Sequence, residues 1–127
     1  KINLWLGISS GDPRATEELA AAYNHSLFYQ PSNSHHGTLP MEESLLETDS
    51  DSVVISAVMP SADGALLVRG YETAGRRAEA VIMLRKKPSS AVQTDLFEQE
   101  IPAAAEVDGC AVKVHVEPYS LFQVKIR

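Results

Sequence analysis

Two short motifs in the sequence contain residue types that bind metal ions. His35 and His36 are adjacent, and neighbouring side chains of an extended chain point to opposite sides, so such a pair rarely binds one ion. Asp49 and Asp51 have the spacing that opens a calcium loop, but the glycine and the closing glutamate of that loop are missing at the required positions. We interpret the histidines as part of a surface loop and the aspartates as a polar turn, with a weak cation site as the alternative.

Carboxylate pairs could serve acid–base chemistry. Glu98 and Glu100 would share one face if a strand continued through both, and glycoside hydrolysis uses two carboxylates about 5 Å or more apart. Carboxylates are common at strand ends, so this spacing alone does not identify an enzyme. The motifs of a serine nucleophile elbow, a phosphate-binding loop, a dinucleotide-binding fold and a zinc protease are absent from the sequence. Cys110, the single cysteine, lies in an alternating run and is interpreted as a small buried side chain.

The composition is that of an ordinary globular domain. The chain has 127 residues, of which 44% are hydrophobic and 22% are charged, and this length is typical of one domain. The net charge of −6 disfavours nucleic acid, because an acidic surface repels the phosphate backbone. With no recognisable membrane span or signal peptide and one cysteine, we expect a soluble, cytoplasmic protein that binds no membrane. The basic groups Arg76-Arg77 and Arg85-Lys86-Lys87 are interpreted as solvated strand ends or turns.

Only one segment has a convincing helical pattern. Asp12 followed by Pro13 is typical of a helix start, and apolar side chains then recur at helical spacing up to Tyr23, with Asn24 at the end. Before this helix, apolar residues alternate over residues 2–8, which predicts a strand that begins at residue 1 or 2. A strand with no lead-in suggests a chain cut from a longer one. After the helix, residues 32–43 are rich in turn formers and predict a loop.

From Leu45 onward the pattern is entirely β. Short apolar runs are separated by turn sequences, and the turns at residues 61–64 and 73–75 end in glycine, as hairpin turns often do. The runs comprise residues 44–46, 53–58, 65–72, 78–84, 92–98, 110–116 and 121–126. Residues 102–107 are predicted to form a loop or a short irregular strand. The sequence therefore predicts a mainly β fold, an antiparallel β-sandwich of about eight strands with one short helix near the N-terminus.

Three segments of the β region carry family motifs. Residues 66–72 read Leu-Leu-Val-Arg-Gly-Tyr-Glu and are followed by Gly75, which gives a strand and turn of the type apolar-Arg-x-aromatic-Glu. Residues 92–98 contain an acidic-Leu-x-Glu segment, and residues 112–126 form a terminal pair of strands with Pro118 and Tyr119 between them. In this order the segments resemble the C-terminal β domain of glycoside hydrolase family 38, the α-mannosidases. The likeness extends over nearly the whole chain.

The resemblance implies a domain that is not itself catalytic. In that family the nucleophilic aspartate, the acid–base carboxylate and a zinc ion held by His and Asp residues belong to a preceding N-terminal α/β domain. We therefore expect residues 1–127 to be a single β-sandwich domain, the C-terminal fragment of a longer retaining glycoside hydrolase, with no cofactor of its own and no activity alone. Its expected partner is the catalytic domain of the same polypeptide, whose substrate is a mannose-containing glycan and whose cleft it would help to shape.

One strand supplies the first candidate interface or cleft residues, Arg69, Tyr71 and Glu72. Arg69 and Tyr71 share one face of this strand, and Glu72 points to the other. A structural ion pair from Arg69 to Asp95 or Glu98 on a neighbouring strand is the default expectation. The alternative is that Arg69 or Glu72 reaches the interface and forms part of the active-site wall.

His35 and His36 are the other candidate contacts. They lie in the polar loop over residues 32–39, and long loops on a rigid sandwich often carry function. We therefore expect this loop to contact the catalytic domain of the parent chain.

Two other classes of protein remain open as alternatives. A stand-alone carbohydrate-binding β-sandwich module would need an exposed aromatic platform, for which Trp5, Tyr29 and Tyr119 are the candidates. A plain immunoglobulin-like spacer would lack the helix, and the Cys…Trp…Cys spacing of that class is absent here. The family resemblance is therefore the preferred interpretation.

Overall fold

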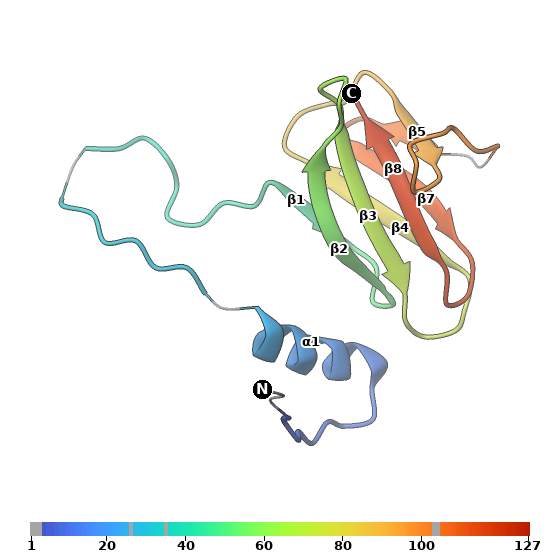
Figure 1. Ribbon diagram of the computed structural model, residues 1–127. Helices are drawn as coiled ribbons and strands as arrows, with labels where there is room; N and C mark the ends of the chain where they lie inside the picture. Colours follow the sequence, from blue (N-terminus) through green and yellow to red (C-terminus); the bar gives the residue numbers. More distant parts are fainter. Residues whose placement is uncertain (1–3, 26, 35, 103–104) are drawn as a thin grey trace. The chain divides into compact units, whose positions relative to one another are not determined.

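The chain forms two compact units, Lys1–Glu43 and Ser44–Arg127 (Figure 1). The computed structural model describes residues 4–25, 27–34, 36–102 and 105–127. No helix in these ranges is both long and apolar enough to cross a membrane. The single domain expected over residues 1–127 stays a prediction.

In the first unit, helix α1 spans Pro13–Asn24, as the sequence predicts. Asp12 caps its N-terminus, because its Oδ1 accepts a hydrogen bond from the Arg14 amide at 3.1 Å. Pro13 occupies the first helical turn, where the N–H that proline lacks has no partner within the helix. The helix start is therefore encoded locally, in the Asp-Pro pair.

The strand predicted at the N-terminus is wrong for residues 4–8, which form no strand. Residues 1–3 lie outside the described residues. Trp5 instead stacks on Tyr23 of α1, with ring centroids 5.5 Å apart and 19° between the ring planes. Leu4, Leu6 and Ile8 are almost fully exposed. Alternation predicts which side chains share a face, but a strand also needs a neighbouring strand to satisfy its backbone hydrogen bonds.

The second unit is a sandwich of two four-stranded antiparallel sheets, with strand orders β1-β4-β7-β6 and β2-β3-β8-β5. Its strands are β1 (Leu46–Thr48), β2 (Val53–Pro60), β3 (Leu66–Glu72), β4 (Ala78–Leu84), β5 (Ala91–Thr94), β6 (Ala105–Asp108), β7 (Ala111–Val116) and β8 (Leu121–Ile126). Figure 1 shows β2, β3 and β8 in front of β4 and β7. The predicted mainly β sandwich with one short helix is confirmed.

Alternate residues of the strands fill the space between the two sheets. Ile82, Val112 and Val114 come from the first sheet, Val68 and Val124 come from the second, and all of them are fully buried. Burial of an aliphatic side chain of this size stabilises the folded state by about 1.5–3 kcal/mol relative to leaving it exposed. If the pairing of one strand shifted by one residue, its core side chains would face solvent. Burial of these side chains therefore fixes the strand register, and the register decides which polar residues lie opposite each other on the outer faces.

Strand β5 is shorter than the sequence predicts and ends at Thr94 rather than at Glu98. Asp95 Oδ1 accepts hydrogen bonds from the Phe97 and Gln99 amides, both at 2.9 Å, and Glu98 adopts a φ of 65°. An aspartate that bonds to the following backbone in this way favours a turn over a strand. The chain therefore turns where the alternation predicted continued pairing.

Three smaller differences concern strand ends. Strand β1 begins at Leu46, where the predicted run 44–46 ends. Residues 105–108 form β6, so the short strand rather than the loop is correct for that part of the predicted region. Cys110 is partly exposed, and its interpretation as a buried side chain is wrong.

Strand β2 contains a β-bulge in its pairing with β3. The register shifts between Ile55 and Ala57, so Ser56 has no opposing residue. Its hydroxyl donates a hydrogen bond to the Arg69 carbonyl at 3.3 Å. The strand ends at Pro60, whose nitrogen cannot donate to a neighbouring strand.

Candidate functional site

Arg69 is bound to an amide side chain on the outer face of its sheet. Its Nε and Nη2 donate hydrogen bonds to Gln123 Oε1 at 3.0 and 2.7 Å, and Gln123 stands directly opposite Arg69 in the β3–β8 register. Charge alone predicted an ion pair of Arg69 with the Asp95 or Glu98 carboxylate. Among the described residues, the Arg69 side chain instead donates to Gln123. A residue directly across the ladder is nearer than an oppositely charged residue further along it.

Gln123, the partner of Arg69, was not predicted as a site residue from the sequence. It is 1% exposed, and its Nε2 donates to Thr94 Oγ1 at 3.1 Å and to the Asp95 carbonyl at 2.8 Å. The amide therefore joins β3, β8 and β5 through both of its polar atoms. The available signal was a polar side chain in the middle of the alternating run 121–126.

Glu72 is buried at the end of β3, where it is 2% exposed. Its Oε1 accepts a hydrogen bond from the Ala74 amide at 2.8 Å, and its Oε2 accepts from the amides of Gly75 at 2.8 Å and Tyr119 at 3.0 Å. Burial by itself would raise the pKa of Glu72, but the backbone N–H groups of Tyr119, Ala74 and Gly75 together lower that pKa below its ordinary value. The carboxylate thus connects the β3–β4 turn to the β7–β8 turn.

Gly75 and Tyr119 meet in the same pair of turns. Both have left-handed backbone, with φ of 71° and 52°. A Cβ atom at Gly75 would lie 2.5 Å from Tyr119 Cζ, so the aromatic ring packs where any other side chain would stand. The ring itself is 76% exposed. The Arg-x-aromatic-Glu motif and the Pro-aromatic motif are therefore in contact with each other.

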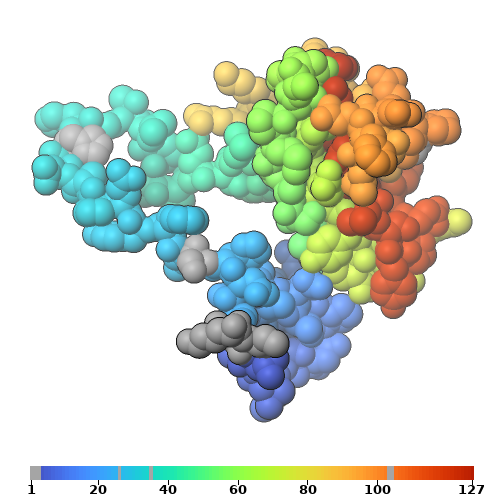
Figure 2. Space-filling view, in the orientation of Figure 1, coloured from blue at the N-terminus to red at the C-terminus, as the bar shows by residue number. Residues whose placement is uncertain are grey.

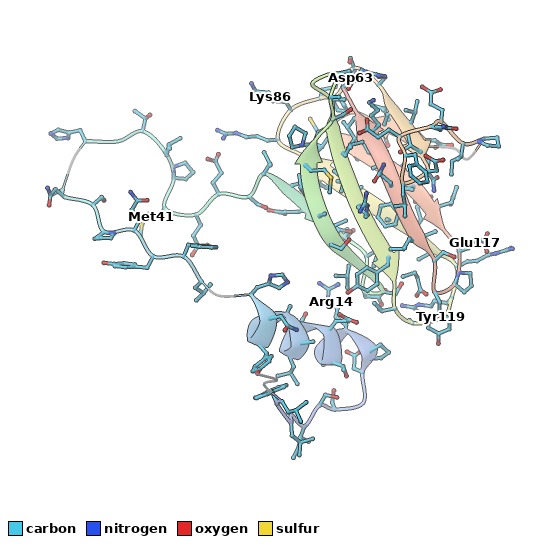
Figure 3. All side chains as sticks on the ribbon, viewed as in Figure 1. Arg14, Met41, Asp63, Lys86, Glu117 and Tyr119 are labelled. Carbon is cyan, nitrogen blue, oxygen red and sulfur yellow. The ribbon has the colours of Figure 1, made fainter. Side chains whose placement is uncertain are left out.

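A second polar cluster lies at the opposite end of the sandwich, where Figure 3 labels Asp63. Lys125 Nζ lies 3.0 Å from Asp63 Oδ2 and 3.1 Å from Glu98 Oε2. Arg127 Nη2 lies 2.7 Å from Asp63 Oδ2. Ser61 shares a hydrogen bond with Glu98. Hydrogen bonds from Arg127 and Lys125 hold the pKa of Asp63 well below its usual range, and those from Ser61 and Lys125 lower the pKa of Glu98. Both carboxylates are ionised ion-pair partners at neutral pH.

Residues 52–121 match the family model of the glycosyl hydrolases family 38 C-terminal beta sandwich domain. The chain belongs to this family. The matched segment contains Arg69, Glu72, Gly75 and Tyr119, and it begins next to β2 and ends at the first residue of β8. No curated protein and no solved structure matches the chain. The resemblance carried by the sequence motifs is thereby confirmed over residues 52–121.

The part of this family 38 sandwich and its N-terminal unit that the structure describes contains no group of three or more His, Cys, Asp or Glu side chains able to hold a metal ion. The Asp51 carboxylate is paired with Arg76 at 2.7 Å. Glu98 and Glu100 were considered as a carboxylate pair on one strand face. They do not form such a pair, because β5 ends at Thr94, before both of them.

The remaining predicted site residues are spread over both units of the family 38 chain. Tyr71 is half-buried on β3, opposite Val54 on one side and Leu121 on the other. His36 is exposed and belongs to the Lys1–Glu43 unit, and His35 lies outside the described residues. The structure therefore groups Tyr71 with Arg69 and Glu72 on one strand.

The aromatic residues proposed for a sugar platform have different surroundings. Trp5 is stacked on Tyr23, Tyr29 is exposed, and Tyr119 packs on Gly75 at the turn of the sandwich. Within the described residues 44–102 and 105–127, Phe97 and Tyr119 are the exposed aromatic side chains. They belong to different loops.

Proposed function

We propose that this chain is a non-catalytic β-sandwich domain of an α-mannosidase-like retaining glycoside hydrolase, and that it supports the catalytic domain of the same polypeptide. The family match over residues 52–121 carries the proposal. In this proposal the nucleophile, the acid–base carboxylate and the zinc ion belong to the catalytic domain. A mannose-containing glycan is the substrate of that domain.

The arrangement of the motif residues supports a positioning role. Glu72 holds two turns through three backbone amides, and Arg69 is held by Gln123, so both charged side chains already serve internal contacts. The Tyr119 ring is exposed at this end of the sandwich. We propose that this ring contacts the catalytic domain and helps to shape its substrate cleft.

The first experiment assays the purified 127-residue chain with an aryl α-mannoside, beside the hydrolase encoded by its native gene. The expected result is turnover by the hydrolase and none by the chain alone. Turnover by the chain alone, or a native gene that encodes no catalytic domain before Lys1, would contradict the proposal. Binding of mannose-containing glycans by the isolated chain would instead favour the stand-alone module.

A second experiment tests the contact residues in the whole hydrolase. Tyr119→Ala removes an exposed ring but keeps the backbone N–H that Glu72 accepts, so the turn pair is retained. His115→Ala on the outer face of the other sheet is the matched control, because its side chain is also exposed. We expect Tyr119→Ala to raise KM about threefold or more and His115→Ala to leave it unchanged. Equal effects of the two variants would contradict a cleft role for this end of the sandwich.

A further inference from the structure

An open groove lies at the end of the sandwich that carries Asp63 and Lys86 (Figure 3). Its volume is about 690 Å³. Leu66 of β3, Leu84 of β4 and Ile126 of β8 supply apolar side chains to it, so residues of both sheets contribute. A concave surface of this size accommodates several side chains of a ligand.

The rim of the groove is cationic. It is formed by Arg85, Lys86, Lys87 and Arg127, and Figure 2 shows the loop that contains the first three, in gold, at the edge of the sandwich. Arg127 is paired with Asp63 at 2.7 Å. The rim therefore surrounds an apolar surface with positive charge.

Lys86 and Lys87 differ from the other cationic residues. Among the described residues they form neither a hydrogen bond nor an ion pair, whereas every other described Lys or Arg has a polar or electrostatic contact. The chain as a whole has a net charge of −6. These two side chains are thus a local excess of positive charge, available to a ligand.

The chemistry of the lining restricts the ligand. None of the described lining residues is aromatic, so the groove offers no ring on which a sugar could stack, and none is acidic, so it offers no anionic ligand for a cation. Nucleic acids and anionic membranes present negative charge over a wide area and would be repelled by the rest of an acidic chain. A short segment that is both acidic and apolar avoids that repulsion.

We propose that this groove binds an acidic peptide segment of another polypeptide, in which carboxylates flank large aliphatic side chains. The aliphatic side chains bury against Leu66, Leu84 and Ile126, and the carboxylates accept hydrogen bonds from Lys86 and Lys87. This inference goes beyond the proposed function, because it concerns a surface at the other end of the sandwich from Glu72 and Tyr119 and needs no catalytic domain.

The test is a titration of the ¹⁵N-labelled 127-residue chain with a synthetic peptide, acetyl-Glu-Leu-Asp-Leu-Glu-Leu-amide, followed by backbone amide shifts. A peptide with Gln and Asn in place of Glu and Asp is the ligand control. We expect amide shifts confined to residues 45, 64–66, 84–87 and 126–127 and binding that weakens as salt is added. Equal binding of the neutral peptide, or shifts elsewhere in the chain, would overturn the proposal.

Two double substitutions distinguish binding in this groove from a general effect of charge on the affinity. Lys86→Gln/Lys87→Gln should weaken the acidic peptide about tenfold, because two carboxylate contacts are lost. Arg76→Gln/Arg77→Gln removes the same charge from an exposed turn outside the groove and should leave the affinity unchanged. Equal losses in the two doublets would refute the site. Binding to phosphatidylserine vesicles without binding to the peptide would refute it as well.

Discussion

The Tyr119 amide donates a hydrogen bond to Glu72 Oε2 at 3.0 Å, although the two residues are 47 positions apart. The same oxygen accepts from Gly75, so one carboxylate holds together two turns, β3–β4 and β7–β8, that each connect one sheet to the other. Both residues lie in the family-matched segment, 52–121. The physical reason for the pairing is that the buried Glu72 carboxylate accepts several hydrogen bonds, two from its own turn and one from the Tyr119 amide.

Replacing Glu72 tests the importance of this contact for stability. Glu72→Gln can accept through one oxygen but presents an NH₂ group to amides that also donate, so we expect the melting temperature to fall by roughly 5 °C or more. Glu79→Gln on the exposed outer face of β4 is the matched control and should change it little. Thermal unfolding followed by circular dichroism gives both values. Equal, small shifts would mean that the turn pair does not depend on the carboxylate.

The glycine at position 75 gives a second prediction. Gly75→Ala adds a Cβ that meets the Tyr119 ring and forces a non-glycine residue to a φ of 71°, which we expect to cost about 1–2 kcal/mol or more. Gly64→Ala isolates the backbone part, because Gly64 has a φ of 82° and an added Cβ would meet no atom within 4 Å. Urea unfolding should show a larger loss for Gly75→Ala. A larger loss at Gly64 would contradict the packing argument.

The hydrogen-bonded pair of Arg69 and Gln123 predicts that substitutions of the two residues have non-additive effects on the free energy of unfolding. Gln123→Leu keeps the side-chain volume but leaves the Arg69 guanidinium without its acceptor, and we expect a loss of about 1–3 kcal/mol. In Arg69→Leu/Gln123→Leu both partners are apolar, so the loss should be smaller than the sum of the two single losses. A double-mutant cycle in urea measures this difference. Additive losses would show that the two side chains do not act as a pair.

The ion cluster at the other end of the sandwich predicts how stability depends on pH. The pKa of Asp63 and that of Glu98 lie below their ordinary values of 3.8 and 4.5. A carboxyl whose pKa is lowered by folding stabilises the fold above its unfolded pKa, and this stability is lost as the pH falls through the folded pKa. We expect the melting temperature to be level from neutral pH to about pH 5 and to decline steadily below about pH 4.

Asp63→Asn is the variant that identifies the cluster as the source. It removes the negative charge shared by Lys125 and Arg127, so the melting temperature should be lower at neutral pH and should decline less steeply in acid. Asp51→Asn, which removes an exposed ion pair with Arg76, is the control and should leave the acid decline intact. Parallel declines in the wild type and Asp63→Asn would assign the pH dependence to other carboxyls.

The strands that form could largely be predicted from the sequence, and the partners of individual residues could not. Alternation with buried valines and isoleucines predicted the interior of β3, β4, β7 and β8, because each of these strands is paired on both sides. The same alternation over residues 4–8 was misleading, since an alternating run forms a strand only where a neighbour is available. Residues 95–98 were misleading because the Asp95 side chain bonds to the local backbone.

In the candidate site, too, residue positions could be predicted from the sequence and their partners could not. Arg69 and Glu72 were predicted from the sequence as site residues, but the partner of Arg69 depends on the strand register. Charge predicted a carboxylate, and the register brought Gln123 opposite instead. The three amides around Glu72 come from two turns, and turn geometry of that kind is not encoded in the periodicity of the strands.

The bulge in β2 has a consequence for how this domain behaves at high concentration. In the described part of the chain β2 pairs only with β3, which leaves its other side as a row of backbone groups that a second molecule could extend into a continuous sheet. The extra residue Ser56 bends that row, and Pro60 removes a donor from it. The fold thus carries its own protection against edge-to-edge aggregation at its longest strand.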